Sequence, residues 1–307
     1  MKYPYVKRLP RFEYLAPKTV DEAISLLSQH NGEARLLAGG TDLLLKMKRQ
    51  GMAPLHLVGL RSIPGLDNIE YDDAQGLTFG PLVTIHAMET SPLVREKFPI
   101  LSQAASTIGS AQIRNLGTVV GNVCNALPSA DMIPSLIVLG AKLRIANIKG
   151  EKTVAIEDLL TGPGQTVLAH DELVVEVQVP CPPPHSGGVY IKHALREAMD
   201  LAIISVATLI TLDEGMCSQV KICLGNVGPT QIRAIKAERI LGGKPFSAGL
   251  VKEASEMASE EAQPRSSMRS SAEYRKEMVR ILTARALNRA KEEVEQNVTI
   301  AQILGRS

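Results

Sequence analysis

Two short glycine-containing segments carry the residues best suited to bind a ligand. The first is Leu36–Leu43 (LLAGGTDL), and the second, about 75 residues further on, is Arg114–Asn122 (RNLGTVVGN). Glycine lets a backbone approach a ligand closely, and consecutive free N–H groups in a tight turn form a concavity that binds anions. One such segment more often only ends a strand. Two of them in one domain indicate a diphosphate held from both sides.

The two segments, in this order and at this distance, resemble the FAD-binding medium subunit of the molybdenum hydroxylase family, the relatives of xanthine dehydrogenase and carbon monoxide dehydrogenase. The family pattern is AGGT or AGGH in the first segment and T-(I/V/L)-G-G-N in the second. The resemblance covers roughly residues 1–290, because further segments also match: PSAD, DELVV, YIKHALR, LGNVGPT and AERILGG.

The resemblance implies that FAD contacts both segments and several residues far from them in the sequence. Gly39 and Gly40 are expected to let the backbone reach the diphosphate, and Thr41 is expected to add a hydroxyl donor. The residues expected to bind the cofactor are Leu36, Leu37, Ala38, Gly39, Gly40, Thr41, Asp42, Leu43, Ile108, Thr118, Gly121, Asn122, Asp131, Val174 and Lys192.

Two charged residues in this set have specific expected roles, and each also has a simpler explanation. Asp131 is expected to accept a hydrogen bond from a ribityl or ribose hydroxyl, but it also stands where a carboxylate would cap a helix. Lys192 is expected near the N1–C2=O edge of the flavin, where a cation stabilises negative charge on the reduced ring and raises its potential. The simpler explanation of Lys192 is a surface lysine on a strand edge.

Val120 departs from the family pattern, which has a glycine at this position. If the position requires a positive φ or a close approach of the backbone, a β-branched residue would disturb the loop. Thr118, Gly121, Asn122 and Asp131 all remain, so the resemblance stands. The departure predicts weaker FAD binding than in a Val120→Gly variant.

No residue of this chain is predicted to perform covalent or metal chemistry. The histidines form no H-x-x-H or H-E-x-x-H grouping, and the four cysteines include no C-x-x-C pair. Neither a G-x-S-x-G motif nor a Walker loop is present. We therefore expect no catalytic residue and no metal ligand, which agrees with a subunit that positions a redox cofactor.

The first glycine segment should lie between a strand and a helix. Thr19–Glu22 fits a capping box that starts a helix, and Asn31–Gly32 supplies its end. Residues 35–38 and 56–60 are predicted strands, and Leu43–Arg49 is predicted to be a short helix or an extended segment. This alternation favours a small α/β subdomain with its functional turn just beyond a strand.

A second α/β subdomain is predicted from about residue 61 to 178. Its helices are expected over Val94–Ser106 and Asp131–Gly140, and its strands over Ala141–Ala146 and Leu173–Val179. The segment Cys181–Gly188 contains three consecutive prolines and is predicted to be a linker.

The C-terminal part has a different pattern, in which short connections predict antiparallel strands. The predicted strands are Gly188–His193, Ala202–Leu212 and Val220–Leu224, and the predicted helices are Gln231–Leu241, Leu250–Ala258 and Ser271–Glu295. In the last helix, Met278, Ile281, Leu282 and Ala286 are spaced to form one face against the sheet.

The resemblance implies an α+β fold in which a two-subdomain FAD-binding α/β unit of the PCMH or vanillyl-alcohol-oxidase type precedes a C-terminal antiparallel sheet with helices. The FAD-binding domain is expected over residues 1–180, with subdomains of about 1–60 and 61–180. The C-terminal domain is expected over residues 186–295.

The resemblance also implies an oxidoreductase subunit that passes electrons from iron–sulfur clusters to FAD and on to an external acceptor. The implied partners are a large molybdopterin subunit and a small subunit with two [2Fe-2S] clusters, arranged as a dimer of heterotrimers. Two alternatives stay open. One is a stand-alone flavin reductase, as in UDP-N-acetylenolpyruvoylglucosamine reductase, and the other is an assembly subunit that has lost flavin through Val120.

Composition restricts the remaining possibilities. The chain has 307 residues, a formal net charge of +2 and no tryptophan, which argues against nucleic acid as a partner. The longest apolar run, Leu201–Leu212, is shorter than the roughly 20 residues needed to cross a bilayer. No apolar stretch of signal-peptide type occurs near Met1. We expect a cytoplasmic protein without a membrane span.

Overall fold

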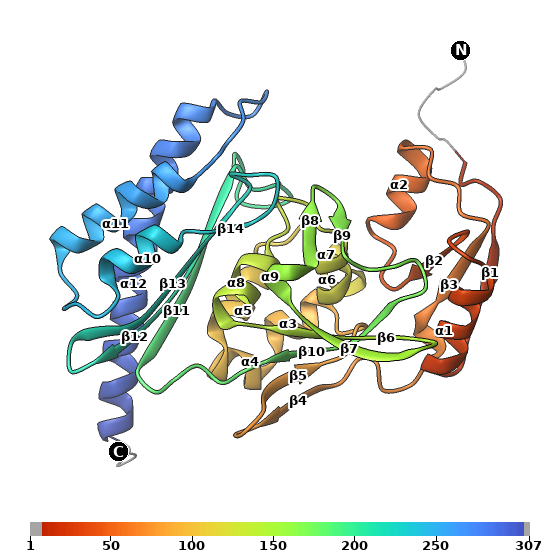
Figure 1. Ribbon diagram of the computed structural model, residues 1–307, viewed down its shortest axis with the longest axis horizontal. Helices are drawn as coiled ribbons and strands as arrows, with labels where there is room; N and C mark the ends of the chain where they lie inside the picture. The colour runs from red at the N-terminus through yellow and green to blue at the C-terminus, as the bar shows by residue number, and fades with distance from the viewer. Residues whose placement is uncertain (1–7, 304–307) are drawn as a thin grey trace.

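The computed structural model describes the backbone of residues 8–303 and the side chains of residues 8–296. Three units follow one another along the long axis of the molecule, and the two ends of the described chain lie at opposite ends of that axis (Figure 1). The three units are a small N-terminal α/β unit, a central sheet with helices on one side, and a C-terminal sheet covered by helices.

The N-terminal unit is a three-stranded parallel sheet of strand order β1-β3-β2. Its elements are β1 (Glu13–Leu15), α1 (Val20–Gln29), β2 (Ala34–Leu37), α2 (Leu43–Arg49), β3 (His56–Gly59) and the short helix η1 (Leu60–Ser62). The predicted cap is confirmed, because the Thr19 hydroxyl accepts the Glu22 amide. The Glu22 carboxylate instead accepts the Lys18 amide at 2.7 Å. Leu43–Arg49 forms a short helix and not an extended segment, which decides between the two predicted structures.

The central unit is a five-stranded antiparallel sheet of strand order β4-β5-β10-β6-β7. Its strands are β4 (Ile69–Asp72), β5 (Gly76–Phe79), β6 (Lys142–Asn147), β7 (Gly150–Ala155) and β10 (Leu173–Val179), and a small hairpin adds β8 (Leu160–Gly162) and β9 (Gln165–Thr166). Helices line one side: α3 (Ile85–Thr90), α4 (Pro92–Lys97), α5 (Pro99–Ser106), α6 (Ala111–Leu116), α7 (Val119–Cys124), α8 (Met132–Leu139) and α9 (Ile156–Leu159).

The predicted helix Val94–Ser106 is wrong, because the chain forms two helices there. Phe98 separates α4 from α5 with an extended φ of −136° and a ψ of 54°. Pro99 follows it, and a proline both lacks an N–H donor and disfavours the helical conformation of the preceding residue. The predicted helix Asp131–Gly140 and the two predicted strands of this unit are confirmed.

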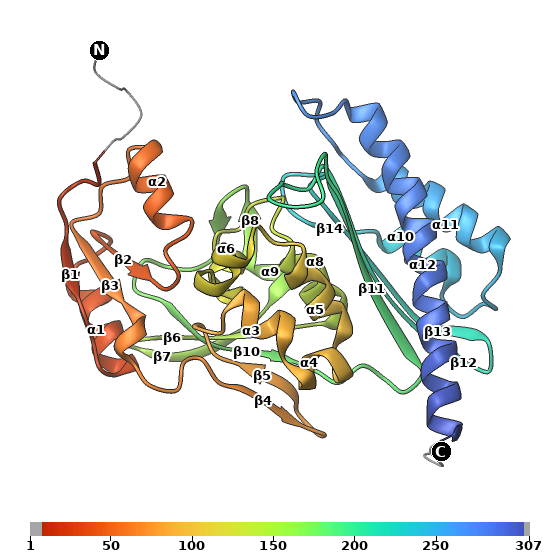
Figure 2. The same ribbon diagram turned by 180° about the vertical axis from the view of Figure 1, so that it is seen from behind.

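The C-terminal unit is an antiparallel sheet of strand order β11-β12-β13-β14. Its elements are β11 (Ser186–His193), β12 (Ile204–Asp213), β13 (Met216–Gly225), β14 (Ile232–Arg233), α10 (Ile235–Leu241), α11 (Ala248–Glu261) and α12 (Ala272–Ile303). Helices α10 to α12 cover its outer face, and its inner face is turned toward the central helices (Figures 1 and 2).

Strand alternation assigns the side chains of β11 to two different cores. Val189 packs in the outer core with α11 and α12, whereas Tyr190 belongs to the core of the central unit. Successive side chains of a strand point to opposite faces, so Lys192, two residues after Tyr190, also points inward. The sheet therefore carries a lysine from the C-terminal unit toward the central unit.

Three predictions for this part need correction. The helix expected at Gln231 begins only at Ile235, after the short strand β14 pairs with β13. The predicted linker ends earlier than expected, because β11 starts at Ser186. The buried face of α12 includes Val279, Leu282 and Ala286, whereas Met278 and Ile281 lie at its edge.

Candidate functional site

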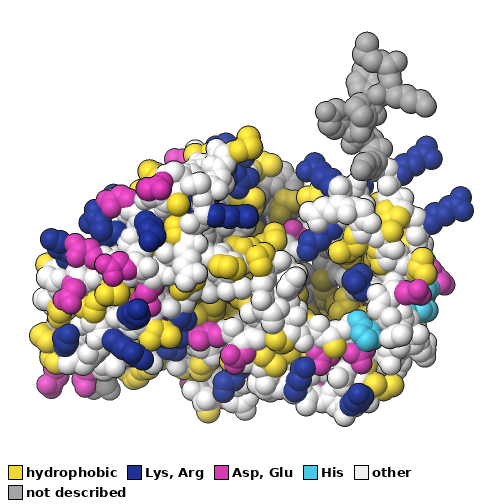
Figure 3. Space-filling view, turned by 45° about the horizontal axis from the view of Figure 1, so that its top comes forward, with side chains coloured by type: hydrophobic (Ala, Val, Ile, Leu, Met, Phe, Trp, Pro, Cys, Tyr) yellow, Lys and Arg dark blue, Asp and Glu magenta, His cyan; other side chains and the backbone are white. Residues whose placement is uncertain are grey.

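A cavity of about 370 Å³ lies between the N-terminal unit and the central unit. Figure 3 shows the face of the molecule that is hollowed between these two units, with hydrophobic side chains around the hollow. Both glycine segments form its walls, together with residues of α2 and the stretch that leads into β10. Ligand sites of small molecules are commonly apolar clefts of about 300–1,000 Å³ with a few polar groups.

The first segment follows β2 and turns into α2. A Cβ on Gly39 would overlap the carbonyl oxygen of Leu116, so glycine is required for the two segments to touch. Gly40 has a φ of +76°, which favours glycine. The backbone amides of Gly40, Thr41 and Asp42 donate to no acceptor in the described part of the chain. These donors at the cavity wall suit an anionic ligand.

The second segment is held against the start of α3. The Ile85 amide donates to Gly117 at 2.9 Å, and the Val119 amide donates to Val83 at 3.0 Å. Thr118 then caps α7, because its hydroxyl accepts the Gly121 amide at 3.0 Å. The segment is therefore the start of a helix and not an open anion-binding turn.

Val120 fits this helix without backbone strain, which corrects the sequence-based concern. It lies within α7 and is absent from the positive-φ residues of the described chain. Its side chain is buried in the core of the central unit and also touches the cavity. The family glycine is therefore replaced by a residue that packs.

Lys46 and Asn125 join the two walls of the cavity. Lys46 lies on α2, and its Nζ donates to Asn125 Oδ1 at 2.5 Å, just after α7. Burial raises the pKa of the Asp42 carboxyl, and the Lys46 charge and a hydrogen bond with Asn125 oppose that rise.

The structure brings together all predicted cofactor residues except Leu37, Asp131 and Lys192, which do not line the cavity. Sequence reasoning missed other wall residues, which are Arg35, Lys46, Met52, Leu60, Pro81, Ile85, Ile113, Gly117, Val120, Cys124, Asn125, Leu168, Glu172 and Leu173. Of these, Glu172 and Leu173 directly precede Val174, which was predicted to contact the cofactor. Their closeness to Val174 in the sequence could have indicated them.

Asp131 and Lys192 form a buried ion pair beside the cavity. Lys192 Nζ lies 2.9 Å from Asp131 Oδ2, and their side chains are 8% and 7% exposed. The Tyr190 hydroxyl donates to the other carboxylate oxygen at 2.6 Å. Burial raises the pKa of the Asp131 carboxyl, while the Lys192 ammonium and both hydrogen bonds counteract the rise.

This ion pair overturns both simpler explanations. Asp131 occupies the N-cap position of α8, but its side chain caps no helix amide. Lys192 is not a surface residue, because β11 directs it inward. It lines a second, smaller cavity of about 250 Å³ on the side of Thr107 that faces the C-terminal unit.

The described residues contain no group of three or more His, Cys, Asp or Glu side chains placed to hold a metal ion. All four cysteines are free thiols. In the part of the chain searched, no helix combines the length and the apolar character needed to cross a membrane.

Two family models match consecutive parts of the chain. Residues 10–182 match the FAD binding domain in molybdopterin dehydrogenase, and residues 189–290 match the CO dehydrogenase flavoprotein C-terminal domain. A putative xanthine dehydrogenase FAD-binding subunit of Escherichia coli K12 is 34% identical over 278 residues, 90% of this chain and 95% of the relative. The carbon monoxide dehydrogenase medium chain of Hydrogenophaga pseudoflava is 33% identical, over 92% and 97%.

Solved structures agree with these matches. A chain of carbon monoxide dehydrogenase from Hydrogenophaga pseudoflava superposes with a TM-score of 0.90 and 34% identity, covering 93% of this chain and 99% of that chain. A chain of quinoline 2-oxidoreductase from Pseudomonas putida 86 gives a TM-score of 0.88 and 30% identity, over 94% and 99%. The chain therefore belongs to the family of FAD-binding medium subunits of the molybdopterin-dependent dehydrogenases.

Proposed function

We propose that this chain binds FAD in the cavity between the N-terminal and central units and serves as the electron-transferring flavoprotein subunit of a molybdenum hydroxylase. It would receive electrons from iron–sulfur clusters of a partner and pass them to an external acceptor. The observation that carries the proposal is the contact of Gly39 with the Leu116 carbonyl, which joins the two glycine segments into one cavity.

The residues present fit this cofactor. The amides of residues 40–42, the Thr41 hydroxyl and the Lys46 ammonium offer donors and positive charge for a diphosphate. Leu36, Ile108 and Val174 offer apolar wall for the rings. Bound FAD would supply the redox chemistry, and the residues of the chain would bind, orient and tune it.

Leu37, Asp131 and Lys192 contribute indirectly in this proposal. Leu37 supports Gly40, because its Cδ1 would lie 3.1 Å from a Cβ at that position. Asp131 holds Lys192, and Lys192 Nζ donates to the Thr107 carbonyl at 3.0 Å, next to Ile108 in the cavity wall.

The assembly is a further part of the proposal. The chain covers 95% to 97% of relatives named as an FAD-binding subunit or a medium chain, which supports its role as a medium subunit in a larger complex. We propose a large molybdopterin subunit and a small subunit with two [2Fe-2S] clusters as partners, in a dimer of heterotrimers.

We divide the chain into an FAD-binding domain (1–180) and a C-terminal domain (186–295). Four free thiols favour a reducing, cytoplasmic location.

The first test is the flavin content of the purified full-length chain. The wild type should show the visible absorption of FAD, whereas Gly40→Val should lose most of it. Gly65→Val is the matched control, because Gly65 has a φ of +78°, close to that of Gly40, and open space around it. Flavin retained by Gly40→Val, or lost equally in both variants, would contradict this site.

The two alternatives separate in the same preparation. An assembly subunit that lacks flavin predicts a colourless wild-type protein. A stand-alone flavin reductase predicts that the tagged chain, expressed with its chromosomal neighbours, purifies without iron–sulfur and molybdopterin partners. The match of residues 189–290 to a carbon monoxide dehydrogenase flavoprotein domain favours the complex.

A further inference from the structure

The turn Thr107–Gly109 has three consecutive carbonyls that are each held by a different element. Lys192 of β11 donates to Thr107 at 3.0 Å, and Arg114 of α6 donates to Ile108 at 3.1 Å. The Met199 amide, in the loop between β11 and β12, donates to Gly109 at 3.3 Å. Ile108 lines the larger of the two cavities described above, so this turn is part of its wall.

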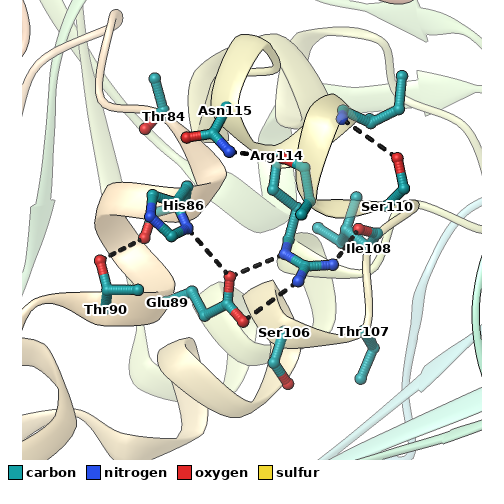
Figure 4. A network of polar contacts seen from close by, with 12 residues as sticks. Thr84, His86, Glu89, Thr90, Ser106, Thr107, Ile108, Ser110, Arg114 and Asn115 are labelled. Atoms are coloured by element: carbon teal, nitrogen blue, oxygen red, sulfur yellow. Dashed lines mark hydrogen bonds and ion pairs between the residues drawn. The ribbon is translucent and has the colours of Figure 1, made fainter.

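Arg114 is itself held by a carboxylate. Its Nε lies 2.7 Å from Glu89 Oε2 and its Nη2 lies 3.4 Å from Glu89 Oε1, and both side chains are 17% exposed. Figure 4 shows Arg114 between Glu89 of α3 and the carbonyl of Ile108. A two-pronged contact of this kind fixes the orientation of a guanidinium more firmly than a single hydrogen bond does.

The backbone of Glu89 is hydrogen-bonded to two neighbouring helices. Its backbone carbonyl accepts Arg95 Nε at 2.9 Å and the Ser102 hydroxyl at 2.7 Å, which join α3 to α4 and α5. His86 Nδ1 also lies 3.5 Å from the carboxylate, at the exposed end of the network. Without Arg114, His86 would be the remaining side-chain partner of this carboxylate among the described residues.

The turn is thus held by two carboxylate–cation pairs on adjacent carbonyls. Glu89 and Arg114 act from within the central unit, whereas Asp131 and Lys192 join the central unit to the C-terminal sheet. We infer that Arg114 and Glu89 are positioning residues for the flavin, because they set the Ile108 turn in the cavity wall. This inference rests on the proposed function.

The alternative is that the Glu89–Arg114 pair only ties α3 to α6. In that case its loss would lower the stability of the chain but would leave the environment of bound FAD unchanged. A spectroscopic signature of the bound flavin separates the two, since the visible circular dichroism of flavin depends on the asymmetry of the groups around its ring.

The experiment compares Arg114→Gln, Arg114→Lys, Glu89→Gln and a matched control in the full-length chain. The control is Arg144→Gln, because Arg144 pairs with Glu151 and Glu176 on the central sheet and does not line the larger cavity. FAD affinity is measured by fluorescence titration, and visible circular dichroism is recorded at saturating FAD. We expect Arg114→Gln to raise the Kd about tenfold and to change the dichroism. Arg114→Lys should recover part of both, and Arg144→Gln should stay within about twofold.

An unchanged Kd and dichroism in Arg114→Gln and Glu89→Gln, in a chain whose wild type binds FAD, would overturn the inference and leave the proposed function intact. A wild type that binds no FAD would instead overturn the proposed function. If Arg114→Gln does not fold, Arg114→Lys and Glu89→Gln decide the matter. Native values in both would then overturn the inference.

Discussion

Replacing Lys192 by methionine should destabilise the chain strongly, because it leaves a buried carboxylate without its cation. Lys192 Nζ lies 2.9 Å from Asp131 Oδ2, with both side chains less than one-tenth exposed, and it also donates to the Thr107 carbonyl. Methionine fills similar space but supplies neither the charge nor the donors. Breaking a buried pair from one side costs about 3–5 kcal/mol.

Thermal unfolding followed by far-ultraviolet circular dichroism measures this cost. At about 2 °C per kcal/mol, the lower end of the scale for large domains, Lys192→Met should lower the Tm by roughly 6 °C or more. Adding Asp131→Asn removes the stranded charge, so the double variant should regain part of the loss. The control is Lys252→Met, whose exposed pair with Glu256 at 4.0 Å should contribute less than about 1 kcal/mol.

The reasoning would be refuted by a Lys192→Met variant that melts within about 2 °C of the wild type. It would also fail if the double variant were less stable than Lys192→Met alone. The first outcome would mean that water or rearrangement screens the pair. The second would mean that the Asp131 carboxylate is stabilised chiefly by Tyr190, whose hydroxyl lies 2.6 Å away.

Two further predictions concern Val120 and Glu293. Val120→Gly should lower stability by about 2 kcal/mol, through lost helix propensity and lost burial, without tightening FAD binding. Separate measurements of Tm and FAD affinity check this, and tighter binding in the variant would restore the family glycine as the better residue. Burial raises the pKa of the Glu293 carboxyl above its usual 4.5, against opposing hydrogen bonds from Gln103 and Gly188. The pKa of Glu293 is then higher in the folded chain than in the unfolded chain, so the free energy of unfolding falls as the pH rises through the range between these two values. Glutamine carries no charge at any pH, so Glu293→Gln should have a higher Tm than the wild type at pH 7. The difference should shrink as the pH is lowered toward about 4.5, and a variant less stable at pH 7 would contradict this sign.

The parts of the fold that could be predicted from the sequence are those that local chemistry determines. The Thr19 cap, the stop at Asn31 and Gly32, and the antiparallel strands of the C-terminal unit are confirmed. The helix break at Phe98 was also encoded locally, in Pro99, but the apolar periodicity across it concealed the break. Strand β14 is only two residues long, too short for any periodicity to reveal.

In the candidate site, too, the features that local sequence determines could be predicted, and those that depend on distant residues could not. The glycine segments were visible because their composition is unusual over a few residues, and they do form one cavity. Lys46 and Asn125 were missed because a lysine within a helix and an asparagine at a helix end are both ordinary, and their 2.5 Å contact joins residues 79 positions apart. The burial of Lys192 likewise depends on Asp131, 61 positions away, which no local pattern reports.

The backbone conformation at Val120 illustrates a distinction that applies to family glycine patterns generally, and its effect on FAD binding stays a prediction. A glycine can stand at a position because φ must be positive, because another backbone passes close by, or because no side chain is needed there. Gly40 meets the first condition and Gly39 the second, whereas Val120 sits in an ordinary helix and packs in the core. We therefore expect a departure from a glycine pattern to weaken a binding site chiefly where one of the first two conditions holds.

In the described part of the chain, the C-terminal unit lines no part of the cavity, but it shares a core with the unit that forms one of the cavity's walls. Tyr190, Leu209 and Cys223 from its sheet belong to the same core as Phe79 and Leu136 of the central unit. Because β11 alternates, the register that buries Tyr190 in this core also delivers Lys192 to Thr107 and Asp131. A shift of one residue in that register would turn both side chains to the opposite face. The packing that joins the two units therefore also fixes the cation that holds the Thr107 carbonyl, so the stability of the chain and the position of this part of the cavity wall depend on the same strand.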